Sequence, residues 1–295
     1  MIEPPSTLMP PRQREQEALH LYPSRKRRER NGRLVVGLVI VTCIVLLALA
    51  APLLSPHDPL QQDLLARRQP PSLSHPFGLD ELGRDNLSRV IYGARLSLAV
   101  GVFASLLAVA VGGLLGALAG YRSGWLDSAA MGVMDVILAF PTLLLAIAVV
   151  AVFGRRLPVV IFAVAFAAIP IYARLARVSV LTTKQREHVV ASRAVGASGG
   201  RLLARHILPN AAPPMLAQFM LGIGIVILEV AGLSFLGLGM PPPTPEWGAM
   251  IGQGRGAVFS APHIVLFPGL ALMVTVVGFN LLGDGLRDAL DPQLR

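Results

Sequence analysis

Long runs of apolar residues, separated by polar stretches of varied length, form the main pattern along this chain of 295 residues. A helix needs about 20 apolar residues to cross the ~30 Å hydrocarbon core of a bilayer. Several runs reach or approach this length, so the pattern predicts an all-α membrane protein with six transmembrane helices. The predicted spans are residues 34–54, 96–120, 129–153, 157–173, 215–239 and 264–283.

The first span has a second interpretation, as a secretory signal peptide, because Ala48 and Ala50 are spaced as at a cleavage site. Residues 1–33 are long for the basic start of a signal peptide, and the apolar run that follows is also long. We therefore interpret residues 34–54 as a membrane span and residues 1–33 as a cytoplasmic N-terminal segment.

Composition and charge support a membrane location. Only 15% of the residues are charged, against about 25% in a typical soluble domain. The net charge is +9, but the basic residues lie between apolar runs, which favours contact with membrane lipid and no nucleic-acid partner. Most Lys and Arg residues fall on one side if both termini are cytoplasmic, as expected for a multi-pass protein of the inner (plasma) membrane.

This orientation divides the chain into an outer, periplasmic segment at 55–95, a core at 96–283 and a cytoplasmic tail at 284–295. An inner loop at 181–212 interrupts the core. The single cysteine, Cys43, cannot form an internal disulfide. The six histidines show no ligand spacing such as His-x-x-x-His, so we expect no metal site within this chain.

The sequence carries no phosphate-binding loop for ATP. Such a loop needs glycine directly before a lysine, and the two lysines, Lys26 and Lys184, follow Arg25 and Thr183. We therefore predict no catalytic residues and no cofactor in this chain. Any ATP and Mg²⁺ would be bound by partner subunits.

The inner loop has the pattern of two short helices. The first is expected over residues 185–195 and stops at Gly196 in a left-handed cap. The second is expected over residues 200–206 and is ended by Pro209. Small side chains on an exposed helix suit docking into the groove of a partner, and they also suit an interfacial helix on anionic lipid. The pattern leaves both interpretations open.

The same loop resembles the EAA loop of binding-protein-dependent ABC importer permeases. In that motif Glu-Ala-Ala is followed by three residues and glycine, and then by nine residues and Ile-x-Leu-Pro. Gly196 falls on the glycine of the motif and Leu208 and Pro209 on its Leu-Pro. Two positions depart from it, since Val190 replaces the glutamate and His206 the isoleucine.

Further blocks are similar to the "C"-type permeases of the dipeptide, oligopeptide and nickel branch of that family. Several blocks in one order are more specific than a single motif. They begin with His-Pro-Phe-Gly-Leu-Asp-Glu-Leu-Gly-Arg-Asp and include Leu-Ser-Phe-Leu-Gly-Leu-Gly. The blocks lie at residues 75–85, 93–97, 135–141, 233–239, 245–248, 279–288 and 291–292.

The resemblance implies a type I ABC importer permease fold, in which ATP hydrolysis by separate subunits drives movement of the membrane helices. Such a permease pairs with a second homologous permease subunit, and two ATP-binding subunits lie below the pair. A periplasmic or lipid-anchored substrate-binding protein delivers substrate from outside. The inner loop then acts as a coupling helix, with these residues at the ATPase contact: Val190, Ala191, Ser192, Ala194, Val195, Gly196, Ala197, Leu208 and Pro209.

Two acidic residues lie within predicted spans, where charges are costly and tend to be paired or functional. Glu229 and Asp135 could line the translocation path, or could form helix–helix hydrogen bonds without touching substrate. A separate pattern, Gly112, Gly116 and Gly120, places three glycines on one helix face. It predicts a close packing seam against another span or against the second permease.

Two other functions compete with this interpretation. A secondary transporter would need carboxylates at mid-membrane, for which Glu229 is the candidate, but it would leave the inner loop unexplained. An intramembrane enzyme would need Ser/His or paired Asp within the spans, and no histidine lies in a predicted span. The resemblance implies import of dipeptides or oligopeptides, with glutathione and nickel or nickel chelates as alternatives.

Overall fold

The computed structural model describes residues 23–290 of the chain. Over these residues the secondary structure is helical, with one isolated β-bridge between Leu79 and Asp85, so the prediction of an all-α protein is confirmed. Most of the predicted N-terminal segment, the 291–292 block and the end of the tail lie outside the described residues.

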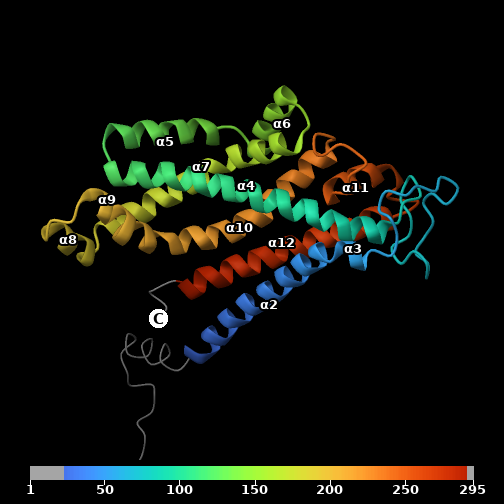
Figure 1. The fold of residues 1–295 in the computed structure, drawn as a ribbon, viewed down its shortest axis with the longest axis horizontal. Coiled ribbons are helices and arrows are strands. Elements are labelled where there is room, and N and C mark those ends of the chain that lie inside the picture. Colours follow the sequence, from blue (N-terminus) through green and yellow to red (C-terminus); the bar gives the residue numbers. More distant parts are fainter. Residues whose placement is uncertain (1–22, 291–295) are drawn as a thin grey trace, which may run out of the picture.

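The helices follow one another as a set of long rods joined by short helical pieces (Figure 1). The long helices are α2 (Pro23–Leu49), α4 (Asn86–Arg122), α7 (Leu157–Lys184), α10 (Leu208–Phe235) and α12 (His263–Leu290). The shorter ones are α3 (Ala51–Leu54), α5 (Trp125–Leu138), α6 (Thr142–Phe153), α8 (Glu187–Ala194), α9 (Gly199–Arg201), the π-helix η2 (Leu202–Ile207), α11 (Trp247–Gly254) and the 3₁₀ helix η3 (Arg255–Ala257).

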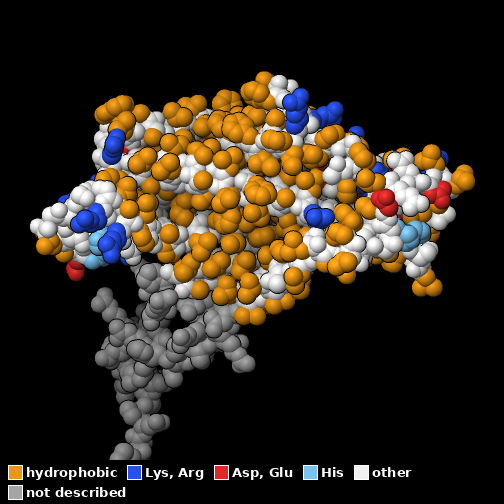
Figure 2. All heavy atoms as spheres, in the orientation of Figure 1, with side chains coloured by type: hydrophobic (Ala, Val, Ile, Leu, Met, Phe, Trp, Pro, Cys, Tyr) orange, Lys and Arg blue, Asp and Glu red, His pale blue; other side chains and the backbone are white. Residues whose placement is uncertain are grey.

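Five of the described helices are long and apolar enough to cross a membrane, and α5 and α6 together make a sixth span if they count as one. Apolar side chains cover the middle of the molecule, whereas the Lys, Arg, Asp and Glu side chains gather toward its two ends (Figure 2). This distribution matches a protein whose middle lies in lipid and whose ends lie in water.

The third predicted span, 129–153, is not one continuous helix. Its two parts, α5 and α6, meet at an angle of 86°. Pro141 lies directly before α6 and has no backbone N–H to donate, and it disfavours helical backbone at Phe140 before it. The predicted third span is therefore present as two helices with a sharp bend between them.

Several helices extend beyond the apolar run that predicted them. Helix α4 begins ten residues before the predicted start at 96, and α7 continues past Pro170 to Lys184. Hydropathy detects only the part of a helix that lies in lipid. The backbone hydrogen bonds of a helix are internal, however, so it can continue into water without a change of structure.

The sequence predicted that Pro209 ends the second loop helix, but in the structure no helix ends there. Pro209 lies in the first turn of α10, where a proline is tolerated because the first N–H groups of a helix have no partner within it. The residues before it, Leu202–Ile207, form a π-helix. The π-helix η2 therefore continues into α10 without a gap, so the fifth span is attached directly to the inner loop.

The first span packs closely on the last. A Cβ atom added to Gly37 of α2 would overlap the backbone of Leu282 in α12. Likewise, a Cβ added to Gly278 of α12 would press on the side chain of Ile40 in α2. Small residues of this kind let two membrane helices approach where no hydrophobic force drives them together. Helix α2 is thereby part of the helical bundle.

Candidate functional site

The inner loop lies at one end of the molecule, beside the C-terminal end of α7 and the N-terminal end of α10 (Figure 1). The start of α2 and the end of α12 lie toward the same end of the view, whereas residues 55–85 lie at the opposite end. The prediction that both termini share a side with the inner loop is consistent with this arrangement.

Helix α8 ends in a Schellman motif centred on Gly196. The N–H of Ala197 donates to the carbonyl of Ser192 at 3.1 Å, and the N–H of Gly196 donates to that of Arg193 at 3.0 Å. Gly196 has a φ of +88°, a conformation that favours glycine because it has no Cβ. The left-handed cap predicted at this residue is confirmed, and the helix is shorter than predicted, at Glu187–Ala194.

One side of α8 is anchored in a small apolar cluster. Val189 is fully buried there, together with Ala117 of α4, Val180 of α7 and Ala211 of α10. Leu202 and Ile207 complete the buried part of the cluster. Helix α8 contacts α7 and η2 directly, and the cluster links these to α4 and α10, so a displacement of α8 would be transmitted through the cluster, because well-packed cores deform little.

The opposite side of α8 is open. Ala191 and Ala194 follow Val189 by two and five positions, which places them on the far side of a helix with 3.6 residues per turn. Of the residues predicted to contact an ATPase, Val190, Ala191, Ala194, Val195, Gly196, Leu208 and Pro209 are exposed, and Ser192 and Ala197 are partly buried. Ala191 and Ala194 share this side with the exposed Glu187, and Val195, which follows the helix, is 87% exposed.

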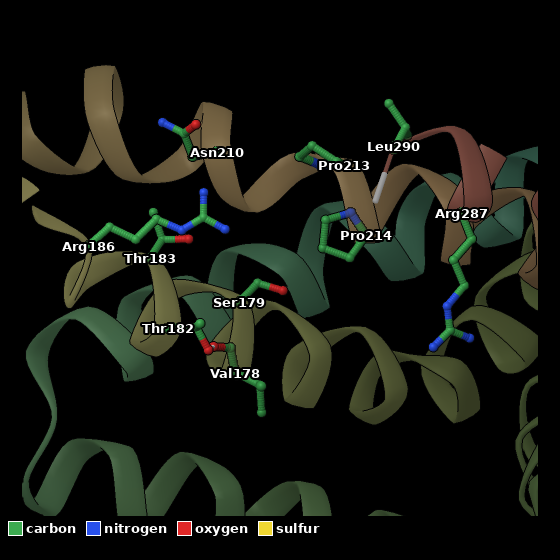
Figure 3. Close-up of a pocket in the computed structure, with 10 residues that line it drawn as sticks. All are labelled: Val178, Ser179, Thr182, Thr183, Arg186, Asn210, Pro213, Pro214, Arg287 and Leu290. Atoms are coloured by element: carbon green, nitrogen blue, oxygen red, sulfur yellow. The ribbon is translucent and has the colours of Figure 1, made fainter. Parts of the chain in front are cut away.

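A cavity of about 360 Å³ lies between the inner loop and the ends of three spans (Figure 3). Arg186, which precedes α8, and Arg287 of α12 lie at its two ends, with Pro213 and Pro214 of α10 between them. Among the described residues that line it, none is acidic. The remaining lining residues are uncharged and come from α7, α10 and α12: Val178, Ser179, Thr182, Thr183, Asn210 and Leu290.

The three glycines of α4 face α7. A Cβ atom added to Gly112, Gly116 or Gly120 would overlap or crowd the backbone of α7 at Ile169, Ala173 or Arg177 respectively. The seam predicted from the spacing therefore lies between two spans of this chain.

Glu229 and Asp135 both have partners in the structure. The hydroxyl of Thr142, the first residue of α6, donates to Glu229 Oε1 at 2.8 Å, so Glu229 ties α10 to the point where the third span is broken. The guanidinium of Arg174 donates to Asp135 Oδ1 at 2.5 Å, which links α5 to α7. Both contacts join two helices of this chain, as expected if Glu229 and Asp135 form helix–helix hydrogen bonds. A role of either residue in the translocation path stays a prediction.

Comparison with known families decides what the chain is. The family model for the inner membrane component of binding-protein-dependent transport systems matches residues 112–295, which is more than half of the chain. The chain belongs to this permease family. A second model, for the N-terminal membrane domain of oligopeptide transport permease C, matches residues 26–71 and thus includes the first span.

Relatives of the permease span nearly its whole length. It is 46% identical over 270 residues to the dipeptide transport system permease protein DppC of Alkalihalophilus pseudofirmus, covering 92% of this chain and 89% of the relative. It is 47% identical over 271 residues to the glutathione transport system permease protein GsiD of Escherichia coli, with the same coverage. The resemblance found from the sequence blocks is confirmed, and the permease is a multi-pass protein of the inner membrane.

The permease also has an ordered outer region that the sequence did not predict. Asp80 pairs with Arg84 at 2.7 Å and with Arg89 at 3.3 Å, and all three side chains are buried. Trp247 is also buried, and its Nε1 donates to the carbonyl of Val90 at 2.9 Å. Trp247 and Val90 are far apart in sequence, so no local spacing could have connected these two.

Glu246 fixes the start of α11 in this region. Its carboxylate accepts hydrogen bonds from the N–H groups of Gly248 and Ala249 at 2.8 and 2.9 Å, and its side chain is 1% exposed. A carboxylate at this position satisfies free N–H groups and interacts favourably with the helix dipole. The sequence block at residues 245–248 is therefore explained by a buried helix cap.

Proposed function

We propose that this permease is the membrane subunit of an ATP-driven importer and receives force from separate ATPase subunits through α8. It would pair with a second homologous permease, and two ATP-binding subunits would hold the ATP and Mg²⁺. A substrate-binding protein would dock on the outer side. The observation that carries the proposal is that α8 exposes Ala191 and Ala194 while Val189, on its other side, is buried in a cluster that includes residues of α4, α7 and α10.

This geometry favours docking to a protein over an interfacial helix on lipid. A helix that lies on a bilayer buries a broad apolar face among lipid chains and directs basic residues toward headgroups. The open face of α8 instead combines Ala191 and Ala194 with the acidic Glu187, and one of the helix's two valines, Val189, is already buried within the chain. Small side chains allow a neighbouring backbone to approach closely, as a groove on a partner requires.

For the substrate we propose dipeptides and short oligopeptides, with glutathione as the second candidate. Support comes from relatives of nearly equal identity, one a dipeptide permease and the other a glutathione permease. Both names describe short peptides. Nickel or nickel chelates remain the more distant alternative.

The coupling role is tested with a bulky residue on the open face of α8. We expect Ala194→Trp, in the full complex reconstituted with its binding protein in proteoliposomes, to lower ATP-dependent uptake at least tenfold. The indole would occupy the space that the partner needs. Uptake of a labelled dipeptide and of labelled glutathione is measured in parallel, and wild type shows which of them is carried.

The matched control is Ala204→Trp, which places the same side chain on an exposed alanine of η2, outside the proposed contact. Co-purification of the second permease with each variant shows that the membrane part has assembled. If Ala194→Trp imports substrate as well as Ala204→Trp does, α8 is not the docking helix. If uptake by wild type needs a proton gradient and no ATP, the importer proposal itself fails.

A further inference from the structure

Three side chains that can bind a metal ion meet in the outer region of the permease. His57 follows α3, His75 lies in the long segment after it, and Asp85 is the residue that caps α4. Each of them offers one ligand atom, and these atoms all lie within 4.8 Å of one another. Neither the coupling proposal nor the substrate proposal makes use of this cluster.

The two distances from Asp85 to the histidines are close to those of a tetrahedral zinc site. Zn²⁺ binds histidine nitrogen and carboxylate oxygen at about 2.0–2.2 Å, so two ligand atoms of a tetrahedral site lie about 3.3 Å apart. Here Asp85 Oδ1 is 2.9 Å from Nδ1 of His75 and 3.8 Å from Nδ1 of His57. The two histidine ligand atoms lie within 4.8 Å of each other, so the rings would approach by at most about 1.5 Å to reach the zinc geometry.

The carboxylate of Asp85 is already oriented for such a role. Its other oxygen, Oδ2, accepts hydrogen bonds from the backbone N–H and the hydroxyl of Ser88 at 2.7 and 2.6 Å. The side chain is 2% exposed, so it has little freedom to rotate. Hydrogen bonds to the second oxygen of a ligating carboxylate hold a metal site in shape.

The two histidines are held by their own backbone contacts. The N–H of His57 donates to the hydroxyl of Ser88 at 3.2 Å, and the N–H of His75 donates to the hydroxyl of Ser72 at 3.1 Å. Their rings lie with centroids 4.5 Å apart. The His57 side chain is 38% exposed, so an ion from the outer solution can reach the site.

We propose that His57, His75 and Asp85 bind one divalent transition-metal ion of the zinc type on the outer face, with a fourth position for water. Two imidazoles and one carboxylate suit such an ion. Mg²⁺ and Ca²⁺ take six or more oxygen ligands and are not matched by this set. The ion would join the loop containing His57 and His75 to the start of α4 and so hold the outer region in one conformation.

The test is a titration of the purified permease with Zn²⁺ in lipid nanodiscs, after bound metal has been removed with a chelator. Affinity and number of sites are measured by competition with a chromophoric chelator, and the thermal midpoint is recorded with and without Zn²⁺. We expect one site per chain, a higher midpoint with Zn²⁺, and no effect of Mg²⁺ at the same concentration.

His57→Ala is the informative variant, because it removes one ligand and leaves both the His75–Asp85 contact and the cap of α4 in place. We expect its Zn²⁺ affinity to fall by on the order of tenfold or more. His57→Cys, which restores a zinc ligand, is expected to recover binding. The matched control is Asp58→Asn, which removes the neighbouring charge, and it is expected to bind Zn²⁺ as wild type does.

Either of two results would overturn the proposal. In the first, wild type binds no Zn²⁺ beyond what His57→Ala binds. In the second, Asp58→Asn loses as much affinity as His57→Ala, which would mean that the ion responds only to surface charge. Both outcomes would leave the three residues as a hydrogen-bonded support for the cap of α4. Neither outcome bears on the coupling function.

Discussion

Gly116 shows how one residue sets the distance between two membrane helices. Its hydrogen faces the backbone of Ala173 in α7, and a Cβ atom at this position would overlap that backbone. Gly113, three positions earlier in α4, would instead place a Cβ 3.4 Å from the end of the Met215 side chain, which can move aside. The two glycines lie three residues apart, and their tolerance of an added methyl group should differ sharply.

We expect Gly116→Ala to destabilise the permease and Gly113→Ala to leave it unchanged or slightly more stable. Overpacking costs about 1–3 kcal/mol, whereas replacing an unconstrained helical glycine by alanine gains about 0.5–1 kcal/mol. Thermal midpoints of both variants in the same detergent provide the measurement. Equal midpoints would show that α4 and α7 are not in close contact at Gly116.

At the scale of elements, the broken third span depends on ion pairs as well as on packing. Asp127 near the start of α5 accepts two hydrogen bonds from the guanidinium of Arg177 in α7, at 2.5 and 2.6 Å. Asp135, further along α5, contacts Arg174 through one hydrogen bond, and both of these side chains are more than half exposed. The two parallel hydrogen bonds at Asp127 fix both the distance and the relative orientation of the carboxylate and the guanidinium.

Asp127→Asn is therefore expected to loosen α5 more than Asp135→Asn does. The substitution leaves Arg177 without its two-point partner in a partly buried position, whereas exposed pairs contribute little to stability. Hydrogen exchange along α5, with thermal midpoints alongside, measures the effect. Equal or reversed effects of the two substitutions would contradict this ranking.

At the scale of the whole molecule, the structure separates an ordered outer region from an inner end that carries α8 and the cavity between Arg186 and Arg287. The long helices connect the two ends, and α10 leads almost without a break from the inner loop to the outer side. A movement of α8 would therefore have a short mechanical route to the opposite face. This route depends on the predicted orientation of the chain.

The orientation is tested by labelling single cysteines with a thiol reagent that does not cross membranes. In a Cys43→Ser background, we expect Ser74→Cys to react in spheroplasts, because Ser74 is exposed in the outer region. Ser198→Cys, which is exposed in the inner loop, should react only after the membrane is opened. The reverse result would place the inner loop outside and exclude contact with cytoplasmic ATPases.

The sequence by itself determined the class of protein, the approximate position of each span and the left-handed cap at Gly196, and it predicts the side on which the inner loop lies. These features follow from local physics: the transfer of an apolar run into lipid, the placement of Lys and Arg at its ends, and the backbone freedom of one glycine. The sequence blocks also indicated the family, because several of them occur in one order along the chain.

Only the tertiary structure decided which residues meet. It showed the break at Pro141, the burial of Val189 beneath α8, the partners of Glu229 and Asp135, and the meeting of His57, His75 and Asp85. Such contacts join positions that are far apart along the chain, and their free energy depends on how whole helices and loops pack. No periodic pattern records that packing, so these features become visible only when the chain is folded.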